Sequence, residues 1–343
     1  MSSLFVNFSG YCGKFNIVEV VLLGSLYDRN FVNISGGLHG FAVEMPTSNW
    51  KNTYGLSSRN VRVSSYPGVF RAVVLGESEE EILQQFHMIV SKVVNDDIGG
   101  TSAAVKVPLL RRIIYDYLEN RVIGEISPYV VSSVKDLSLD DIDGSFVIIP
   151  AAETLIEMKY PEITGVLLMK LWFVPIGKME DILYLIGILP AFAPDKIVET
   201  VKLPNNIDIP DVLRGGVLYE RIGNTFIIAS WLVADITEKK KMQSFMDHVF
   251  SIHSANFLPS QLVKSDTLDI FKEKLYLSLA IEFNRPASRL LALMNFTSST
   301  RSKILPNDIV ELVSRMDLIG FKRMLRIVRT SPVKDIVVSG VES

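Results

Sequence analysis

The spacing of apolar residues changes near residue 235, and this change constrains the fold most. Before it, short runs rich in Val, Ile and aromatic residues are separated by Gly, Pro and Asn clusters, which is typical of β-strands. After it, apolar residues recur at helical spacing. We therefore expect an α+β fold, with a β-rich mixed amino-terminal domain over residues 1–234 and a carboxyl-terminal helical bundle over residues 235–343.

Local signals predict individual elements. Ser78 and Glu81 form a capping box, which predicts a helix after Gly76, and Pro108 is suited to open a second helix. Further helices are predicted from Asp235 and over Glu180–Leu189, Asp266–Phe283, Pro286–Phe296 and Asn307–Thr330, the last with a potential break at Gly320. Val166–Val174 fits either a strand or a helix. Further strands are predicted at Leu4–Phe8, Ile17–Leu23, Phe41–Glu44, Val61–Ser64, Val69–Leu75, Val217–Glu220 and Thr225–Val233.

Composition bounds the class of protein. The apolar fraction of 48% is enough to bury a core, and a single cysteine, Cys12, excludes an internal disulfide and a zinc ribbon. The stretch Ile163–Ala193 is the most apolar, but charges and prolines interrupt it, so we interpret it as buried core and expect no membrane association. With no secretory signal recognised, we expect a cytoplasmic protein, and the scarcity of glutamine points to a heat-loving host.

One segment, residues 45–76, is basic and contains no carboxylate. Its cations could neutralise phosphates, its aromatic rings could stack on bases, and its asparagines could contact base edges. The alternative is a solvated, irregular loop. The residues predicted to bind nucleic acid here are Lys51, Arg59, Arg62, Arg71, Trp50, Tyr54, Asn49 and Asn52.

The last predicted helix carries a second basic feature. At helical spacing Lys322, Arg326 and Arg329 lie on one side, and Arg315 joins them if the helix is continuous, while Met324, Ile327 and Val328 lie on the other side. This face could follow a phosphate backbone, or it could be a solvated face that complements the negative end of the helix. The residues concerned are Lys322, Arg323, Arg326 and Arg329.

Catalytic groups are sparse. His39 stands in a Gly-rich segment and is the one weak candidate for a general acid or base. The sequence contains no phosphate-binding loop, no dinucleotide fingerprint and no nucleophile elbow. We therefore expect no metal site and no cofactor.

The layout resembles the large subunit of archaeal type I-A CRISPR interference complexes. The resemblance rests on the β-rich portion with a basic loop, the helical basic portion, the length of about 340 residues, the single cysteine and the Gln-poor composition. It implies a non-catalytic subunit of a crRNA-guided complex, which helps to recognise the protospacer-adjacent motif. Its partners would be DNA or guide RNA and the other protein subunits. No site residue is carried over, because no family motif matches residue by residue.

The sequence therefore predicts a nucleic-acid-binding subunit of a larger assembly. Two alternatives stay open at this point. One is a metal-independent ribonuclease that uses His39 with Tyr11 or a lysine. The other is a self-assembling structural protein that buries its long apolar stretch against further copies of itself.

Overall fold

The structure is a computed structural model, and it describes most of the predicted strands and the last predicted helix. The helix expected from Asp235 lies outside the described residues except for Ser244, and Asn49 and the helix expected over 286–296 lie outside them too. The described residues are 3–11, 14–23, 39–46, 50–76, 78–94, 108–119, 122–123, 129–132, 147–148, 152–153, 155–163, 165–194, 214–222, 224–234, 244, 265–284 and 306–340.

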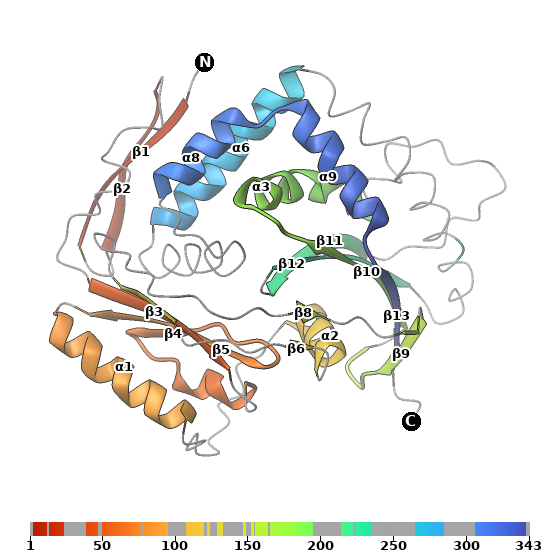
Figure 1. Ribbon diagram of the computed structural model, residues 1–343, viewed down its shortest axis with the longest axis horizontal. Helices are drawn as coiled ribbons and strands as arrows, with labels where there is room; N and C mark the ends of the chain where they lie inside the picture. The colour runs from red at the N-terminus through yellow and green to blue at the C-terminus, as the bar shows by residue number, and fades with distance from the viewer. Residues whose placement is uncertain are drawn as a thin grey trace. The chain divides into compact units, whose positions relative to one another are not determined.

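The chain divides into two compact units, each built from two separate stretches. The first combines Met1–Ile149 with Glu273–Ser314, and the second combines Pro150–Lys272 with Arg315–Ser343. Both contain strands and helices, so the expected α+β class is confirmed (Figure 1). The division does not coincide with the boundary expected at residue 234. The carboxyl-terminal region is also not entirely helical, because Val333–Ser339 forms a strand.

The described residues of the first unit form three antiparallel sheets. Strands β1 (Ser3–Tyr11) and β2 (Lys14–Leu23) form a hairpin, and β6 (Val122–Ile123) pairs with β8 (Val147–Ile148). The largest sheet has the order β4-β5-β3-β7. Its strands are β3 (His39–Pro46), β4 (Val61–Val63), β5 (Val69–Gly76) and β7 (Tyr129–Ser132).

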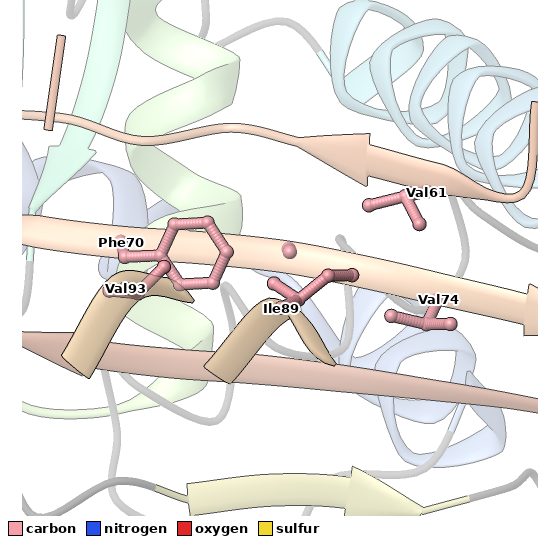
Figure 2. Close-up of a cluster of buried hydrophobic side chains, with 6 residues drawn as sticks. Val61, Phe70, Val74, Ile89 and Val93 are labelled. Carbon is pink, nitrogen blue, oxygen red and sulfur yellow. The ribbon is translucent and has the colours of Figure 1, made fainter. Parts of the chain in front are cut away.

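Helix α1 (Glu79–Val94) packs on this four-stranded sheet. Glu81 donates its backbone N–H to the Ser78 hydroxyl at 3.2 Å, so the predicted helix start is confirmed. Alternate residues of β5 share one face of the sheet, and side chains of α1 complete the cluster, as Figure 2 shows. The buried cluster consists of Val61, Phe70, Ala72, Val74, Ile89 and Val93.

The remaining helical elements of the first unit follow the predicted pattern in part. The helix expected after Pro108 is α2 (Leu109–Leu118), and the short helix η2 (Asn52–Leu56) lies within the segment that was expected to be a loop. Helix α6 (Ser265–Asn284) begins in the second unit and ends in the first, and α8 (Pro306–Arg315) lies in the first unit except for Arg315.

In the part of the second unit that the structure describes, the strands form a five-stranded sheet with the order β11-β12-β10-β13-β9. Its pairs are antiparallel except β13 with β9, which is parallel. The strands are β9 (Leu155–Lys159), β10 (Val166–Pro175), β11 (Arg214–Ile222), β12 (Thr225–Ala234) and β13 (Val333–Ser339).

Helices α3 (Met179–Ile188) and α9 (Leu318–Thr330) also belong to this unit (Figure 1). The short helix η3 (Leu189–Phe192) follows α3. Trp172 of β10 meets Phe192 of η3 edge to face, with ring centroids 5.0 Å apart. Nearly all of β10 and α3 is buried, so the interpretation of Ile163–Ala193 as core is confirmed. Within the described parts of the chain, no helix is long and apolar enough to cross a bilayer.

The predicted final helix is in fact two helices. The break lies at Met316 and Asp317, not at Gly320, because Asp317 caps the second helix: its carboxylate accepts the Gly320 N–H at 2.7 Å. Arg315 therefore ends α8 and is not part of the basic face of α9. Strands β7, β9 and β13 were not predicted, whereas Val166–Val174 proves to be a strand.

Candidate functional site

The described residues of the acid-free segment, 45–46 and 50–76, form the end of β3 and all of η2, β4 and β5, so this part is not an irregular loop. Trp50 is 5% exposed, and its ring meets Tyr115 of α2 edge to face, with centroids 5.6 Å apart. A buried ring is not available to stack on a base, so the expected role of Trp50 needs correction: it anchors the segment to α2. The Tyr54 side chain lies outside the described part of the structure.

Lys51 forms ion pairs with Asp116 of α2 and with Glu119, the residue that follows α2. Its Nζ lies 3.3 Å from Asp116 Oδ1 and 3.0 Å from Glu119 Oε2, and 5.3 Å from the centre of the Trp50 ring. Partial burial lowers the pKa of Lys51, but the hydrogen bond to Glu119 and the two negative charges outweigh it and raise the pKa. The charge proposed to anchor phosphate is therefore already compensated within the protein.

Arg71 lies inside the fold. It is 4% exposed, its guanidinium is centred 4.8 Å from the Tyr66 ring, and Nη2 donates to the Tyr66 hydroxyl at 3.2 Å. Nearby, Thr53 Oγ1 lies 2.6 Å from the Trp50 carbonyl oxygen and 2.7 Å from Ser65 Oγ. The Thr53 contacts hold η2 against the strand region. Because Arg71 is buried and bonded to Tyr66, it is structural and cannot reach a phosphate from this position.

The remaining cations of the segment do reach solvent. Arg59 and Arg62 are exposed, as is Asn52, and Arg62 lies on the edge strand β4. Because Lys51 is paired and Arg71 is buried, the segment does not present the four cations as one continuous free surface.

Helix α9 has the predicted two-sided character. Lys322, Arg326 and Arg329 are exposed, whereas Met324 and Val328 are buried. Arg323 departs from the prediction because its Nη2 donates to Asp181 Oδ1 on α3 at 2.5 Å. This guanidinium links two helices and is not a free phosphate ligand.

Asp181 is the centre of that link, and the sequence reasoning missed it. Its other oxygen, Oδ2, accepts the backbone N–H groups of Gly177 and Lys178, each at 3.1 Å. The carboxylate thus stabilises the start of α3 and also pairs with Arg323 of α9. An acidic residue in the first turn of a predicted helix is the signal that could have identified it.

A second link joins the same helices. Asp317 donates its backbone N–H to the Tyr184 hydroxyl at 3.0 Å, and the Gly320 backbone lies against the Tyr184 ring. Burial raises the pKa of Tyr184, and the negative charge of Asp317 adds to that rise. Together the two links fix the position of α3 relative to α9. Both are structural contacts between the helices.

The candidate catalytic group also gains no support. His39 lies at the start of β3, opposite Gly76, and the side chains of His39 and Tyr11 are outside the described part of the structure. No three side chains of His, Cys, Asp or Glu come together to hold a metal ion in the described regions.

Comparison with known proteins gives a fold but no sequence relative. No protein-family model and no curated protein matches the sequence. A putative M16-like peptidase from Alicyclobacillus acidocaldarius aligns over 89% of this chain and 93% of its own, with 8% identity and a TM-score of 0.56. A chain of complex III2 from Candida albicans with Inz-5 bound aligns over 90% and 92%, with 9% identity and a TM-score of 0.57.

The periplasmic protease PqqL from Escherichia coli is also similar, with 10% identity and a TM-score of 0.56. The alignment covers 89% of this chain but only 43% of PqqL, so the chain spans less than half the length of that protease.

The sequence lacks the short motifs by which many zinc peptidases bind their metal. Both H-E-x-x-H and the inverted H-x-x-E-H place two histidines four residues apart. The four histidines are His39, His87, His248 and His253, and none is followed by another at that distance. The residues present therefore do not fit a zinc site of either kind.

These likenesses overturn the predicted function. Two of these structures are a protease and a putative M16-like peptidase, and the prediction of a CRISPR subunit that binds nucleic acid was wrong. The predicted role in antiviral defence was wrong for the same reason. The expectation failed because it rested on composition and element order, which unrelated α+β proteins share. The expected partners, DNA or guide RNA and other subunits, stay predictions that no contact here tests. At 8–10% identity, what the chain shares with M16-like peptidases is their fold.

Proposed function

We propose that this protein binds extended polypeptide segments and does not hydrolyse them with a motif-bound zinc ion. The observation that carries the proposal is a peptidase-like fold in a sequence without either two-histidine zinc motif. Polypeptide is the substrate class of a peptidase, and one of the similar structures is that of a putative M16-like peptidase. The fold is compatible with a polypeptide ligand, and the missing motif removes that route to cleavage.

The geometry supports the outer edge of β9 as the binding site. An extended peptide can add to a sheet where an edge strand offers unpaired backbone groups. β9 ends the five-stranded sheet, and no described strand pairs with its outer edge. Tyr160 donates its backbone N–H to the Ser339 oxygen of β13 at 2.9 Å, which fixes the direction of the backbone groups.

Backbone groups alternate in direction along a strand. Because Tyr160 faces β13, so do Ile156 and Met158, while the N–H and C=O groups of Leu155, Glu157 and Lys159 point outward. The side chains of these three residues are also exposed, and that of Leu155 is 44% exposed. An added strand would thus contact the apolar Leu155 at one end of β9, and then the acidic Glu157 and the basic Lys159.

The test uses a variant that removes one outward N–H. Lys159→Pro should weaken the binding of a fluorescently labelled, unfolded polypeptide about tenfold or more, because proline cannot donate to an added strand. Lys159→Thr changes the same side chain but keeps the N–H, so it should bind within about twofold of the original protein. Anisotropy titration measures both.

Mass spectrometry of the same mixtures, with and without added Zn²⁺, checks for cleavage. We expect the labelled polypeptide to stay intact. Zinc-dependent fragments would contradict the proposal, and so would equal affinity in the proline and threonine variants.

A further inference from the structure

The outer edge of β9 presents a row of side chains on one face of the sheet. Successive side chains of a strand point to opposite faces, so Leu155, Glu157 and Lys159 share a face, and exposure along β9 alternates accordingly. The same three residues direct their backbone groups away from β13. A polypeptide that pairs with β9 must therefore place alternate side chains beside these three residues.

Two of the three side chains are available to such a polypeptide. Among the described helices and strands, β13 is the element in extensive contact with β9, and it lies on the inner side. Leu155 is 44% exposed although it is apolar, and Lys159 is exposed and has no carboxylate partner among the described residues. Glu157 already interacts with another group of the protein, so we assign selectivity to Leu155 and Lys159.

The neighbouring strand does not neutralise Lys159. The residue of β13 directly opposite Lys159 is the uncharged Ser339. At the other end of β9, Asp335 lies opposite Leu155, but its carboxylate pairs with Lys170 of β10 at 2.9 Å. The edge thus presents an unpaired cation at one end and an exposed apolar side chain at the other.

The direction of the added strand sets the order of the residues that meet these two side chains. We expect an antiparallel strand, since antiparallel pairing is slightly more stable per residue than parallel pairing. Lys159 and Leu155 each direct both backbone groups outward, so each forms a hydrogen-bonded pair with the residue opposite it. In the added strand, the residue opposite Lys159 comes first, and the residue opposite Leu155 follows four positions later.

We propose that β9 prefers polypeptide segments in which an acidic residue is followed, four positions later, by an apolar residue. The acidic side chain lies opposite Lys159 and the apolar one opposite Leu155. Opposite charges that face each other across two strands are favourable, as are apolar pairs, whereas like charges are unfavourable. This inference rests on the proposed function, because it assigns a class of polypeptide to the same edge.

The preference is modest at each position, because both side chains are open to solvent. A solvent-exposed ion pair of this kind changes affinity by about twofold. That is the limit expected for Lys159→Thr with an unfolded polypeptide. Replacing the attraction by a repulsion adds a similar change, so exchanging an acidic for a basic residue opposite Lys159 should lower affinity about fourfold.

Labelled peptides of seven residues test the preference. The first has Glu at its second position, Leu at its sixth and Thr elsewhere; the second has Lys in place of Glu; the third exchanges the places of Glu and Leu. In anisotropy titrations the first should bind about fourfold more tightly than the second. The difference should shrink in 1 M NaCl, because salt screens exposed charges. The third should bind more weakly than the first, because its order fits only a parallel strand.

Charge reversal at Lys159 tests which residue is responsible. Lys159→Glu should reverse the preference, so that the second peptide binds about fourfold more tightly than the first. Lys322→Glu makes the same change at an exposed residue of α9, outside the sheet, and should keep the original preference. Leu155→Thr should remove the advantage of Leu over Thr at the sixth position of the peptide.

Equal binding of the first two peptides, or a preference that Lys159→Glu does not reverse, would overturn the inference. If Lys159→Pro still weakens both peptides in that case, binding at β9 stands and only the selectivity is wrong. If Lys159→Pro weakens neither, the proposed binding site is wrong and the selectivity fails with it. Tighter binding of the third peptide than of the first would mean that the added strand is parallel, and would overturn the order assigned here.

Discussion

The Tyr184 hydroxyl accepts a hydrogen bond from the backbone N–H of Asp317 at 3.0 Å, although the residues are 133 positions apart. Asp317 is also the cap of α9, since its carboxylate accepts the Gly320 N–H. One tyrosine of α3 thus fixes the residue at which α9 begins. The relation explains why the predicted long helix is divided at this point, and it is a feature of packing between distant segments.

Tyr184→Phe should lower the free energy of unfolding by about 1 kcal/mol. The change removes the hydroxyl that accepts the Asp317 N–H and keeps the ring, which meets Phe321 edge to face. Urea denaturation followed by circular dichroism measures the difference. An unchanged unfolding midpoint would show that solvent or another group replaces the hydroxyl.

Tyr184 should also contribute to the alkaline pH dependence of stability. Burial and the nearby Asp317 charge raise its pKa above the ordinary value of 10.0, so the folded state holds the phenol proton more tightly than the unfolded state does. Its contribution is present below pH 10 and is lost as pH rises through the folded pKa. Above pH 10, the unfolding free energy of Tyr184→Phe should therefore fall less steeply than that of the original protein. Parallel curves would contradict this assignment.

Gly320→Ala should destabilise the protein by about 2 kcal/mol. A Cβ at this position would overlap the Tyr184 ring, which packs closely in the second unit and has little room to move. Gly177→Ala is the matched control, because the nearest atom to its Cβ would be Asp181 Oδ2 at an ordinary 3.5 Å. Thermal unfolding should separate the two variants, and equal melting temperatures would show that the helices separate without cost.

Arg323→Gln should lower the free energy of unfolding by about 1 kcal/mol, because it leaves the nearly buried Asp181 carboxylate without its cationic partner. The backbone N–H groups of Gly177 and Lys178 still bind that carboxylate, which limits the loss. Arg326→Gln removes an exposed charge from the same helix and should change stability by less than about 0.5 kcal/mol. Equal effects in both variants would mean that the pair with Asp181 contributes nothing.

The elements predicted well are those with local signals. The capping pair Ser78 and Glu81 marked the start of α1, and the spacing of Met324 and Val328 marked the buried side of α9. Such signals depend on residues within one or two turns of each other. The mixed α+β class could be predicted for the same reason.

The features that were missed depend on distant partners. β13 pairs with β10 and β9, which precede it by well over a hundred residues, so its short run of sequence gives no indication of the sheet it completes. The number of cations available to bind phosphate was overestimated for the same reason. Lys51 is paired by Asp116 and Glu119, and Arg323 by Asp181, and no local spacing brings these charges together.

Native mass spectrometry of the protein mixed with an unfolded polypeptide and Zn²⁺ tests the central claim most directly, because one spectrum reports both binding and cleavage. Our account predicts a complex that contains the intact polypeptide, and it predicts loss of that complex in Lys159→Pro but not in Lys159→Thr. Polypeptide fragments that appear only with Zn²⁺, or a spectrum without any complex, would contradict it.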